Sequence, residues 1–277
     1  MKNKLGHYDK ERREYVVNLA NDEITPRPWS NIITNKNFGT SVTSSGASFT
    51  WFLNSALFRL TPWVNDVVLE KSGETVLLVD KTTGEKWSPM LLPIREKEPY
   101  EIRHGLGYTT FEHTSHKLRQ KVRVFVHPEK PIKYIEINLK NLSRVPRKIS
   151  ISYSCQWILG DFLDNTTHFL WTGMTPNKDT LVAKVLVDDF RSGYTAYLSC
   201  IDKKTIELDG ATITKIINLP ASGEATTTFC LGIIRDGESH TIPSSLAFDK
   251  SQDFWQDITS TISVVTPDAD LNNLFND

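Results

Sequence analysis

The 277-residue sequence lacks features that would tie it to a membrane or a polyanion. No apolar run reaches the roughly 20 residues of a membrane span, and the first residues lack the apolar segment of a signal peptide. The 32 basic and 33 acidic side chains leave a formal charge of −1, so no electrostatic footprint for nucleic acid is present. We therefore expect a cytoplasmic chain without nucleic-acid or membrane contacts.

Cysteine is scarce and its spacing is unsuited to a metal knuckle. The sequence has only Cys155, Cys200 and Cys230, an odd number without a Cys-x-x-Cys pair. Cys155 alternates in phase with Ile151 and Tyr153, which places it on the apolar face of a strand. We expect all three cysteines to be reduced core residues.

Motifs for phosphate, serine or metal chemistry are also missing. The segment 103–107 has two glycines, but it lacks the lysine of a phosphate loop and precedes a strand rather than a helix. The serine-rich segment 41–48 has no Gly-x-Ser-x-Gly elbow. His104, His113 and His116 lack the carboxylate pattern that accompanies zinc ligands. The sequence therefore predicts neither a metal nor a cofactor.

Short alternating or apolar segments dominate from residue 14 to residue 234. Residues 75–80 and 85–87 form the clearest hairpin, because Gly84 between them can take the positive φ that a tight turn needs. Residues 148–155 alternate strictly and should continue an antiparallel meander from 120–126 and 132–139. Many short strands separated by turn residues predict a large all-β sandwich. The other expected strands are 14–19, 46–52, 181–187, 194–201, 211–219 and 225–234.

Helical periodicity appears only near the C-terminus. Apolar residues recur at helical spacing within 248–262. Thr266 followed by Pro267 predicts the capped start of a second helix.

The stretch from Asn37 to Asp66 has the composition of a sugar-facing surface. Trp51 and Trp63 supply flat apolar faces for a pyranose, and the Asn, Asp and Arg side chains between them supply donors and acceptors for hydroxyls. Because Trp and Phe are more often core residues than ligand contacts, a hydrophobic strand with a polar turn is the alternative.

An ordered series of motifs resembles the N-terminal region of glycoside hydrolase family 94, formerly glycosyltransferase family 36. The family holds cellobiose and related β-glucan phosphorylases and the glucan-chain domain of cyclic β-1,2-glucan synthase, and the aromatic motifs resemble the β-1,2-glucan members most. The motifs are Pro26-Arg-Pro-Trp-Ser-Asn31, Asn37-Phe-Gly39, Phe49-Thr-Trp51, Leu60-Thr-Pro-Trp63, Asn65-Asp66, Trp87-Ser-Pro89, Arg103-His-Gly-Leu-Gly-Tyr-Thr109 and Asn141-Leu-Ser143.

The resemblance implies a fold and a place for the chemistry. It implies a galactose mutarotase-like β-supersandwich of two large antiparallel sheets over residues 1–250 and the beginning of a helical linker over 251–277. On this resemblance we expect the family's catalytic (α/α)6-barrel to be absent from this chain. In that barrel an Asp protonates the glycosidic oxygen while inorganic phosphate, a co-substrate, attacks the anomeric carbon. No catalytic residue is therefore transferred to this chain.

The resemblance also implies partners. In the family this domain packs on the barrel, and a homodimer brings it toward the partner's active site. We expect the loop 51–66 and the turn 103–108 to border a bound β-gluco-oligosaccharide. The alternative is that these segments only form the interface between the domain and the barrel. The substrate-binding candidates are Trp51, Asn54, Arg59, Asp66, Arg103, His104 and Tyr108.

Three functions remain open at this point. The preferred one is a non-catalytic domain that supports the barrel, dimer assembly and β-glucan binding, with an exposed apolar surface where the barrel would pack. The second is a free-standing carbohydrate-binding module. The third is a mutarotase-like sugar enzyme, which would need Glu112 or Asp66 within hydrogen-bond reach of His104 or His113.

Overall fold

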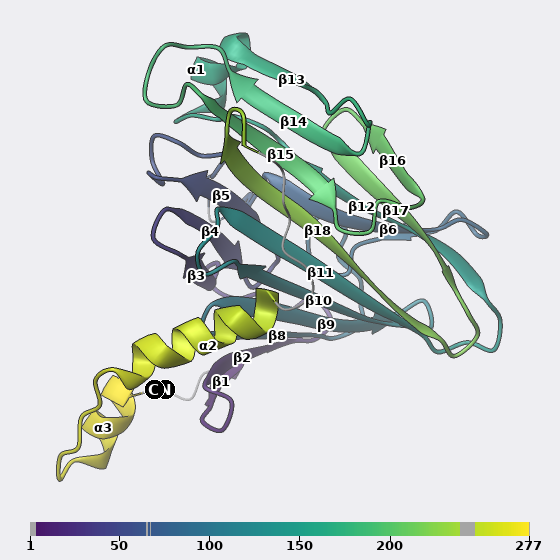
Figure 1. Cartoon of the computed structure of the whole chain (residues 1–277). Coiled ribbons are helices and arrows are strands. Elements are labelled where there is room, and N and C mark those ends of the chain that lie inside the picture. The colour runs from purple at the N-terminus through teal and green to yellow at the C-terminus, as the bar shows by residue number, and fades with distance from the viewer. Residues whose placement is uncertain (1–3, 65, 67, 239–246, 277) are drawn as a thin grey trace.

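The computed structural model describes residues 4–64, 66, 68–238 and 247–276. Most of the regular secondary structure in these residues consists of antiparallel strands (Figure 1). The described residues make three sheets. The ten-stranded sheet has the order β1 (Gly6–Asp9), β2 (Glu14–Leu19), β8 (Tyr100–Gly105), β9 (Tyr108–Ser115), β10 (Leu118–Val126), β11 (Ile132–Asn141), β18 (Glu224–Arg235), β15 (Tyr194–Cys200), β14 (Thr180–Val185) and β13 (Leu170–Met174). The five-stranded sheet has the order β16 (Ile206–Asp209), β17 (Thr212–Leu219), β12 (Arg147–Cys155), β6 (Glu74–Asp80) and β7 (Lys86–Trp87), and the three-stranded sheet is β3 (Ser30–Thr34), β4 (Phe38–Thr43) and β5 (Ser48–Phe52).

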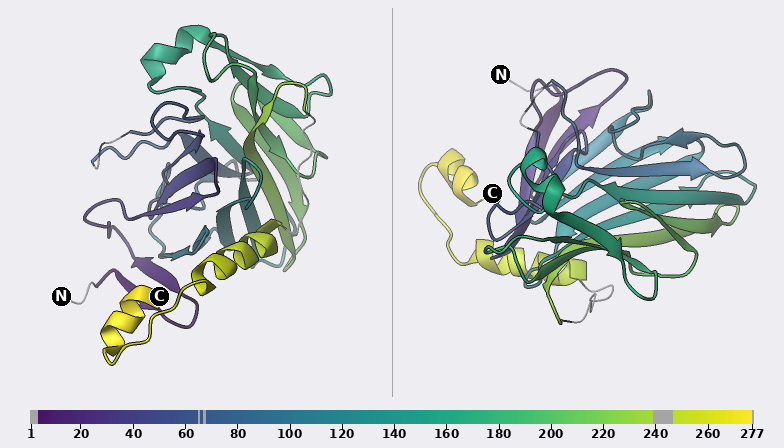
Figure 2. Two further views of the ribbon diagram at one scale, coloured as in Figure 1. Left: turned by 60° about the vertical axis from the view of Figure 1, so that its left-hand side comes forward. Right: turned by 90° about the horizontal axis from the view of Figure 1, so that it is seen from above.

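Both smaller sheets pack against one face of the ten-stranded sheet (Figure 2). The side chains alternate between two apolar clusters, because successive residues of a strand point to opposite faces. In β10, Val122 and Val124 join the main core between the sheets, whereas Phe125 joins a second cluster on the opposite face. The predicted all-β antiparallel supersandwich is thus confirmed, with its second layer divided into two sheets.

The predicted meander holds for β10 and β11 but is wrong for the next strand. β11 pairs with β18, whereas β12 crosses to the other layer and pairs with β6 and β17. The Nδ2 of Asn141 donates to the carbonyl oxygens of Val145 (2.8 Å) and Pro220 (2.9 Å), which fixes the crossing turn. The alternation of residues 148–155 gave the buried face of β12 correctly but carried no information about the neighbouring strand.

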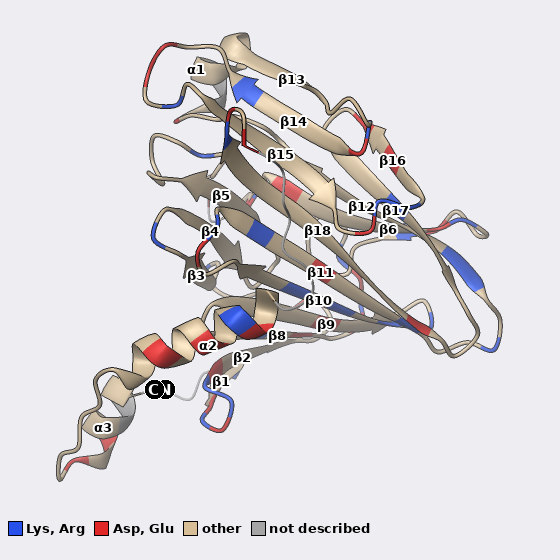
Figure 3. Cartoon of the chain, viewed as in Figure 1, with Lys and Arg blue, Asp and Glu red and all other residues tan. Residues whose placement is uncertain are grey.

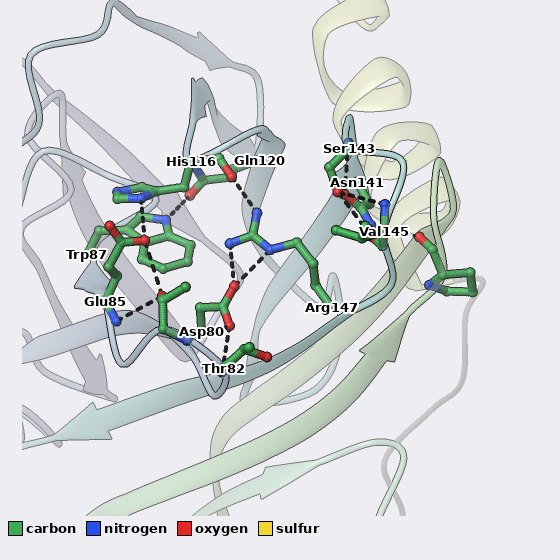
Figure 4. A network of polar contacts seen from close by, with 12 residues as sticks. Asp80, Thr82, Glu85, Trp87, His116, Gln120, Asn141, Ser143, Val145 and Arg147 are labelled. Atoms are coloured by element: carbon green, nitrogen blue, oxygen red, sulfur yellow. Dashed lines mark hydrogen bonds and ion pairs between the residues drawn. The ribbon is translucent and has the colours of Figure 1, made fainter.

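A polar network at one end of the sandwich also joins the two layers (Figure 4). The guanidinium of Arg147 in β12 donates to Asp80 Oδ2 at 2.8 and 2.5 Å and to the carbonyl oxygen of His116 in the β9–β10 turn. The imidazole of His116 stacks on Trp87 with ring centroids 4.2 Å apart. These contacts connect the five-stranded sheet to the ten-stranded one.

The predicted helix after residue 248 is confirmed as α2 (Ala247–Ser260), which lies on the outer face of the large sheet (Figure 1). Phe248 packs edge-on against Tyr108 and Phe125, and the guanidinium of Arg123 lies 3.7 Å above the Phe248 ring centroid. The apolar spacing of α2 therefore reflects docking on the sandwich.

A second helix also follows, α3 (Ala269–Asn276), but its cap differs from the prediction. Asp268, rather than Thr266, accepts hydrogen bonds from the amides of Asp270 (2.9 Å) and Leu271 (3.2 Å). Thr266 lies two residues earlier and accepts from the Asp268 amide. The negative charge of a carboxylate at the N-cap also interacts favourably with the positive end of the helix dipole. Two further short helical segments are α1 (Leu163–Thr166) and a 3₁₀ turn (Thr167–Phe169).

The cysteines and the charged side chains lie where the composition led us to expect them. Cys155, Cys200 and Cys230 are buried free thiols, and burial raises the pKa of each. Lys and Arg are interspersed with Asp and Glu over the strands and along α2 (Figure 3). Among the described helices, none combines the length and apolar character needed to cross a membrane.

Candidate functional site

A pocket of about 380 Å³ lies over the outer face of the three-stranded sheet. Its aromatic wall is formed by Phe49 of β5 and Trp63, whose rings stack with centroids 5.6 Å apart and planes inclined by 27°. Trp63 is 48% exposed, so much of its surface is accessible from solvent. The remaining lining residues are Arg27, Pro28, Ser30, Ile32, Ser41, Thr43, Ala47, Ser48, Pro62, Val64, Asp66, Glu70 and Lys71.

Asp66 is the sequence-predicted site residue that lines this pocket. Its Oδ1 accepts hydrogen bonds from the amides of Leu69 (3.0 Å) and Val68 (2.8 Å), and these bonds lower the pKa of the Asp66 carboxyl. Asp66 is therefore a fixed anion at neutral pH. Asn65, which precedes it in the motif, lies outside the described residues.

Arg59 stabilises the loop that leads into the pocket. Its Nε donates to the carbonyl oxygen of Ser55 (2.7 Å) and its Nη1 to that of Asp161 (2.9 Å), and its guanidinium lies 5.4 Å from the Trp63 ring centroid. The residue is only 8% exposed, and burial lowers the pKa of Arg59. A cation over an aromatic face holds that ring in place, so Arg59 positions Trp63.

Trp51 and Asn54 lie beside the pocket rather than in its lining. The Trp51 ring covers Gly39, where an added Cβ would lie 2.4 Å from the indole, and it contacts Phe49 at a centroid distance of 5.2 Å. Asn54 is exposed and its Oδ1 accepts from the amides of Ala56 (2.8 Å) and Leu57 (3.0 Å). Trp51 therefore supports the aromatic wall, and Asn54 closes the turn after β5.

The second predicted group lies in the β8–β9 hairpin, where Arg103 is surrounded by carboxylates. Its guanidinium contacts Glu101 at 2.7 Å, Glu14 at 2.9 Å and Asp9 at 3.2 Å, and the Glu101 hydrogen bond is the largest cause of its raised pKa. The hydroxyl of Tyr108 donates a hydrogen bond to the carboxylate of Glu14. Burial together with that carboxylate raises the pKa of Tyr108. These contacts join β1, β2, β8 and β9.

His104 is a neutral, largely buried member of the same hairpin. Its Nδ1 lies 3.0 Å from the hydroxyl of Thr109. Burial lowers the pKa of His104 to about 4, and the nearby Trp29 backbone opposes that shift only in part. At neutral pH the imidazole therefore carries no charge.

The structure does not bring the two predicted groups into one pocket. In β3, Ser30 and Ile32 face the pocket, whereas the side chain of Asn31 between them points to the opposite face of the sheet. The Nδ2 of Asn31 donates to the carbonyl oxygens of Gly105 (2.9 Å) and Tyr108 (2.8 Å). The hairpin with Arg103, His104 and Tyr108 thus supports the three-stranded sheet from behind.

The pairs required for mutarotase-like chemistry do not form among the described contacts. Glu112 binds Lys121 at 2.6 Å, and Asp66 accepts from backbone amides. His113 instead contacts Glu96 at 3.0 Å, and His116 contacts the same carboxylate at 2.5 Å. Glu96 was not predicted as a site residue, because a glutamate within a charged run has the pattern of an exposed loop residue.

Comparison with known proteins places these features in a family. The family model described as "Glycosyl hydrolase 94, supersandwich domain" matches residues 13–214. The cyclic beta-(1,2)-glucan synthase NdvB of Rhizobium meliloti (strain 1021) is 29% identical over 319 residues, which cover 99% of this chain and 11% of that protein. The N,N'-diacetylchitobiose phosphorylase of Vibrio proteolyticus is 26% identical over 203 residues, covering 69% of this chain and 25% of that protein. The chain thus spans a quarter or less of the length of these two relatives.

Among solved structures, a kojibiose phosphorylase from the human microbiome matches with a TM-score of 0.48 and 14% identity, covering 100% of this chain and 38% of that one. A galactose mutarotase related enzyme from Lactobacillus acidophilus also matches with a TM-score of 0.48, at 9% identity, covering 77% of this chain and 100% of that one. The family match extends over more than half of the sequence. The chain therefore belongs to glycosyl hydrolase family 94, through the supersandwich domain of that family.

Proposed function

We propose that this supersandwich is a non-catalytic domain of a β-glucan phosphorylase or cyclic β-1,2-glucan synthase-like enzyme, and that its pocket holds one glucosyl unit of the glucan. The pocket over β3, β4 and β5 carries the proposal. An exposed indole at Trp63 offers a stacking face for a pyranose, and the fixed carboxylate of Asp66 accepts hydrogen bonds from hydroxyls. The volume of about 380 Å³ is at the lower end of the range usual for small-molecule sites.

The residues predicted to bind substrate divide into three roles under this proposal. Asp66 contacts the sugar, whereas Arg59, Trp51 and Asn54 hold the aromatic wall and its loop in position. Arg103, His104 and Tyr108 support the sheet from behind. We propose β-1,2-linked glucan as the ligand because a cyclic beta-(1,2)-glucan synthase aligns with 99% of this chain.

The rest of the enzyme would complete the chemistry. Exposed apolar side chains gather in the segments around α1 and β14, including Phe162, Phe169, Leu186 and Phe190. Such a surface suits the docking of a catalytic barrel or of a second subunit in a homodimer. Inorganic phosphate would then bind in the barrel, outside this chain, in a cytoplasmic enzyme that needs no other cofactor.

Titration of the chain with β-1,2-gluco-oligosaccharides tests the pocket. We expect binding in isothermal titration calorimetry, with a weaker response to β-1,4-gluco-oligosaccharides, and a Trp63→Ala variant should lose at least about tenfold in affinity because the stacking face is removed. Trp171→Ala is the matched control, since Trp171 is 45% exposed on the edge strand β13 and does not line the pocket. An affinity that is unchanged in Trp63→Ala, or that falls equally in both variants, would contradict the proposal.

A further inference from the structure

His113 of β9 is a buried imidazole whose two nitrogens both face oxygen acceptors. Its Nδ1 lies 3.0 Å from the carbonyl oxygen of Pro99, and its Nε2 lies 3.0 Å from Oε2 of Glu96. A carbonyl oxygen can only accept, so Nδ1 carries a proton and the lone pair of the neutral ring is on Nε2. Nε2 in turn faces a carboxylate oxygen, and either a proton or a metal ion can lie between these two atoms.

The ring is held in this orientation from two sides. The Tyr100 ring stacks on it with centroids 3.9 Å apart and planes inclined by 6°. The hydrogen bond from Nδ1 to a backbone carbonyl is the arrangement that commonly orients a metal-binding histidine and fixes its tautomer. His113 therefore presents Nε2 in one defined direction.

Glu96 is held in place beside it by further polar contacts. Its Oε2 accepts a hydrogen bond from the hydroxyl of Ser115, and its Oε1 lies 2.5 Å from Nε2 of His116. Ser115 in turn accepts from the Nε2 of Gln120 (2.8 Å), whose Oε1 accepts from the indole of Trp87 (2.9 Å). The carboxylate is thus positioned by a network that reaches the five-stranded sheet.

A third ligand is within reach. Carboxylate oxygens of Glu96 and Glu98 and a ring nitrogen of His113 lie within 4.8 Å of one another. Two ligand atoms at about 2.1 Å from one zinc ion are about 3.4 Å apart at the tetrahedral angle. His113 Nε2 and Glu96 Oε2 lie 3.0 Å apart, so they would separate by about 0.4 Å to admit the ion. Glu98 is exposed and its side chain is free to turn toward the ion.

We propose that Glu96, Glu98 and His113 form a Zn²⁺ site that ties the 95–99 loop to β9 and leaves one coordination position for water. Imidazole and carboxylate are ligands that zinc accepts, and three protein ligands with an open position are typical of an accessible rather than a closed site. A cavity of about 490 Å³ lined by Pro99, Tyr100 and His113, among others, adjoins the site and gives the ion a route from solvent.

Zinc titration of the tag-free chain, after removal of bound metal with EDTA and dialysis, tests the proposal. Isothermal titration calorimetry with ZnCl2 should give one site per chain, and thermal unfolding should shift to higher temperature in its presence. Glu98→Gln should weaken binding at least about tenfold while leaving the fold intact, because Glu98 is exposed. Glu112→Gln is the control: Glu112 lines the same cavity but lies outside the ligand set, so zinc affinity should be unchanged.

A crystal grown with ZnCl2 should give an anomalous peak at the zinc edge about 2.1 Å from Nε2 of His113. The absence of zinc binding, or binding that Glu98→Gln leaves unchanged, would overturn the proposal. So would a ¹⁵N spectrum in which both nitrogens of His113 stay protonated in the presence of zinc, because a proton would then occupy the place of the metal.

Discussion

At the scale of single residues, burial decides the protonation of His104. The side chain is largely enclosed within the support behind the three-stranded sheet, and its pKa is lowered to about 4. A histidine that stays neutral in the folded state lowers the free energy of unfolding at pH values where the unfolded chain binds a proton at that histidine. His104 should therefore give the domain a measurable sensitivity to mild acid.

The expected effect follows from linkage. The unfolded state binds a proton at His104 below pH 6.5, whereas the folded state does so only near pH 4, so stability falls as pH is lowered between these values. The difference between these two pKa values corresponds to about 3 kcal/mol at most. Urea unfolding of the native chain and of His104→Gln at pH 7 and pH 4.5 should show a loss that is about 2 kcal/mol smaller in the variant. Equal losses would rule out this role for His104.

Residue contacts were the part of the site least accessible from sequence. The residues Arg103, His104 and Tyr108 were recognisable as a motif, but the partners Asp9 and Glu14 lie about 90 positions earlier in the chain. Local spacing carries no information on such pairs, because they form only when β2 and β8 become neighbours. Asp66 differs, because its Oδ1 accepts from the amides of Val68 and Leu69, two and three positions further along the chain.

At the scale of elements, α2 is positioned by a contact that only glycine permits. Gly107, in the turn between β8 and β9, has a φ of +79°, and a Cβ at this position would lie 2.0 Å from the indole of Trp255. The indole thus lies directly on the backbone of the hairpin. Gln252 adds a hydrogen bond to the carbonyl oxygen of Leu106.

We predict that Gly107→Ala releases α2 from the sandwich. The methyl group displaces Trp255, and the positive φ adds about 1 kcal/mol of backbone strain. Gly84→Ala is the matched control, because Gly84 has a φ of +78° with nothing within 4 Å of an added Cβ. Hydrogen exchange of residues 247–260 should accelerate in Gly107→Ala and stay unchanged in Gly84→Ala. Equal exchange in the two variants would show that the Trp255 contact does not hold the helix.

Element prediction succeeded where the sequence pattern reflects burial. The strict alternation of 148–155 and the helical spacing of 248–262 correspond to β12 and α2. The edge strand β13 (Leu170–Met174) was not predicted, because it is short, contains Gly173 and has mostly exposed side chains. An edge strand buries too little to impose a pattern on its residues.

At the scale of the whole molecule, a buried ion pair joins all three sheets. Lys133 of β11 is 1% exposed and Glu74 of β6 is 3% exposed, and their Nζ and Oε2 atoms lie 2.6 Å apart. Lys133 also donates to the hydroxyl of Thr40 in β4 (2.9 Å), and Glu74 accepts from Thr50 in β5 (2.6 Å) and Tyr153 in β12 (2.5 Å). The pair thus lies where the three sheets meet.

Sequence alone did not reveal this junction. The strands and the sandwich could be predicted from alternation, but Lys133 and Glu74 are polar residues at the ends of their strands and looked like surface positions. Charged residues are rarely buried unless paired, and the partner is 59 residues away. The division of the second layer into two sheets was missed for the same reason, since only long-range contacts define it.

A double-mutant cycle tests whether this pair holds the sheets together. Lys133→Met should lower the free energy of unfolding by about 3 to 5 kcal/mol, because it leaves the Glu74 carboxylate buried without its cation. Glu74→Gln in the Lys133→Met background should recover part of that loss, so the double variant is less destabilised than the sum of the two single variants by about 1 to 3 kcal/mol. Urea unfolding with an unchanged m value measures each step. The partly exposed pair Lys121 and Glu112 is the control, and Lys121→Met should change stability by about 1 kcal/mol or less. Additive losses at Glu74 and Lys133 would contradict a coupled junction.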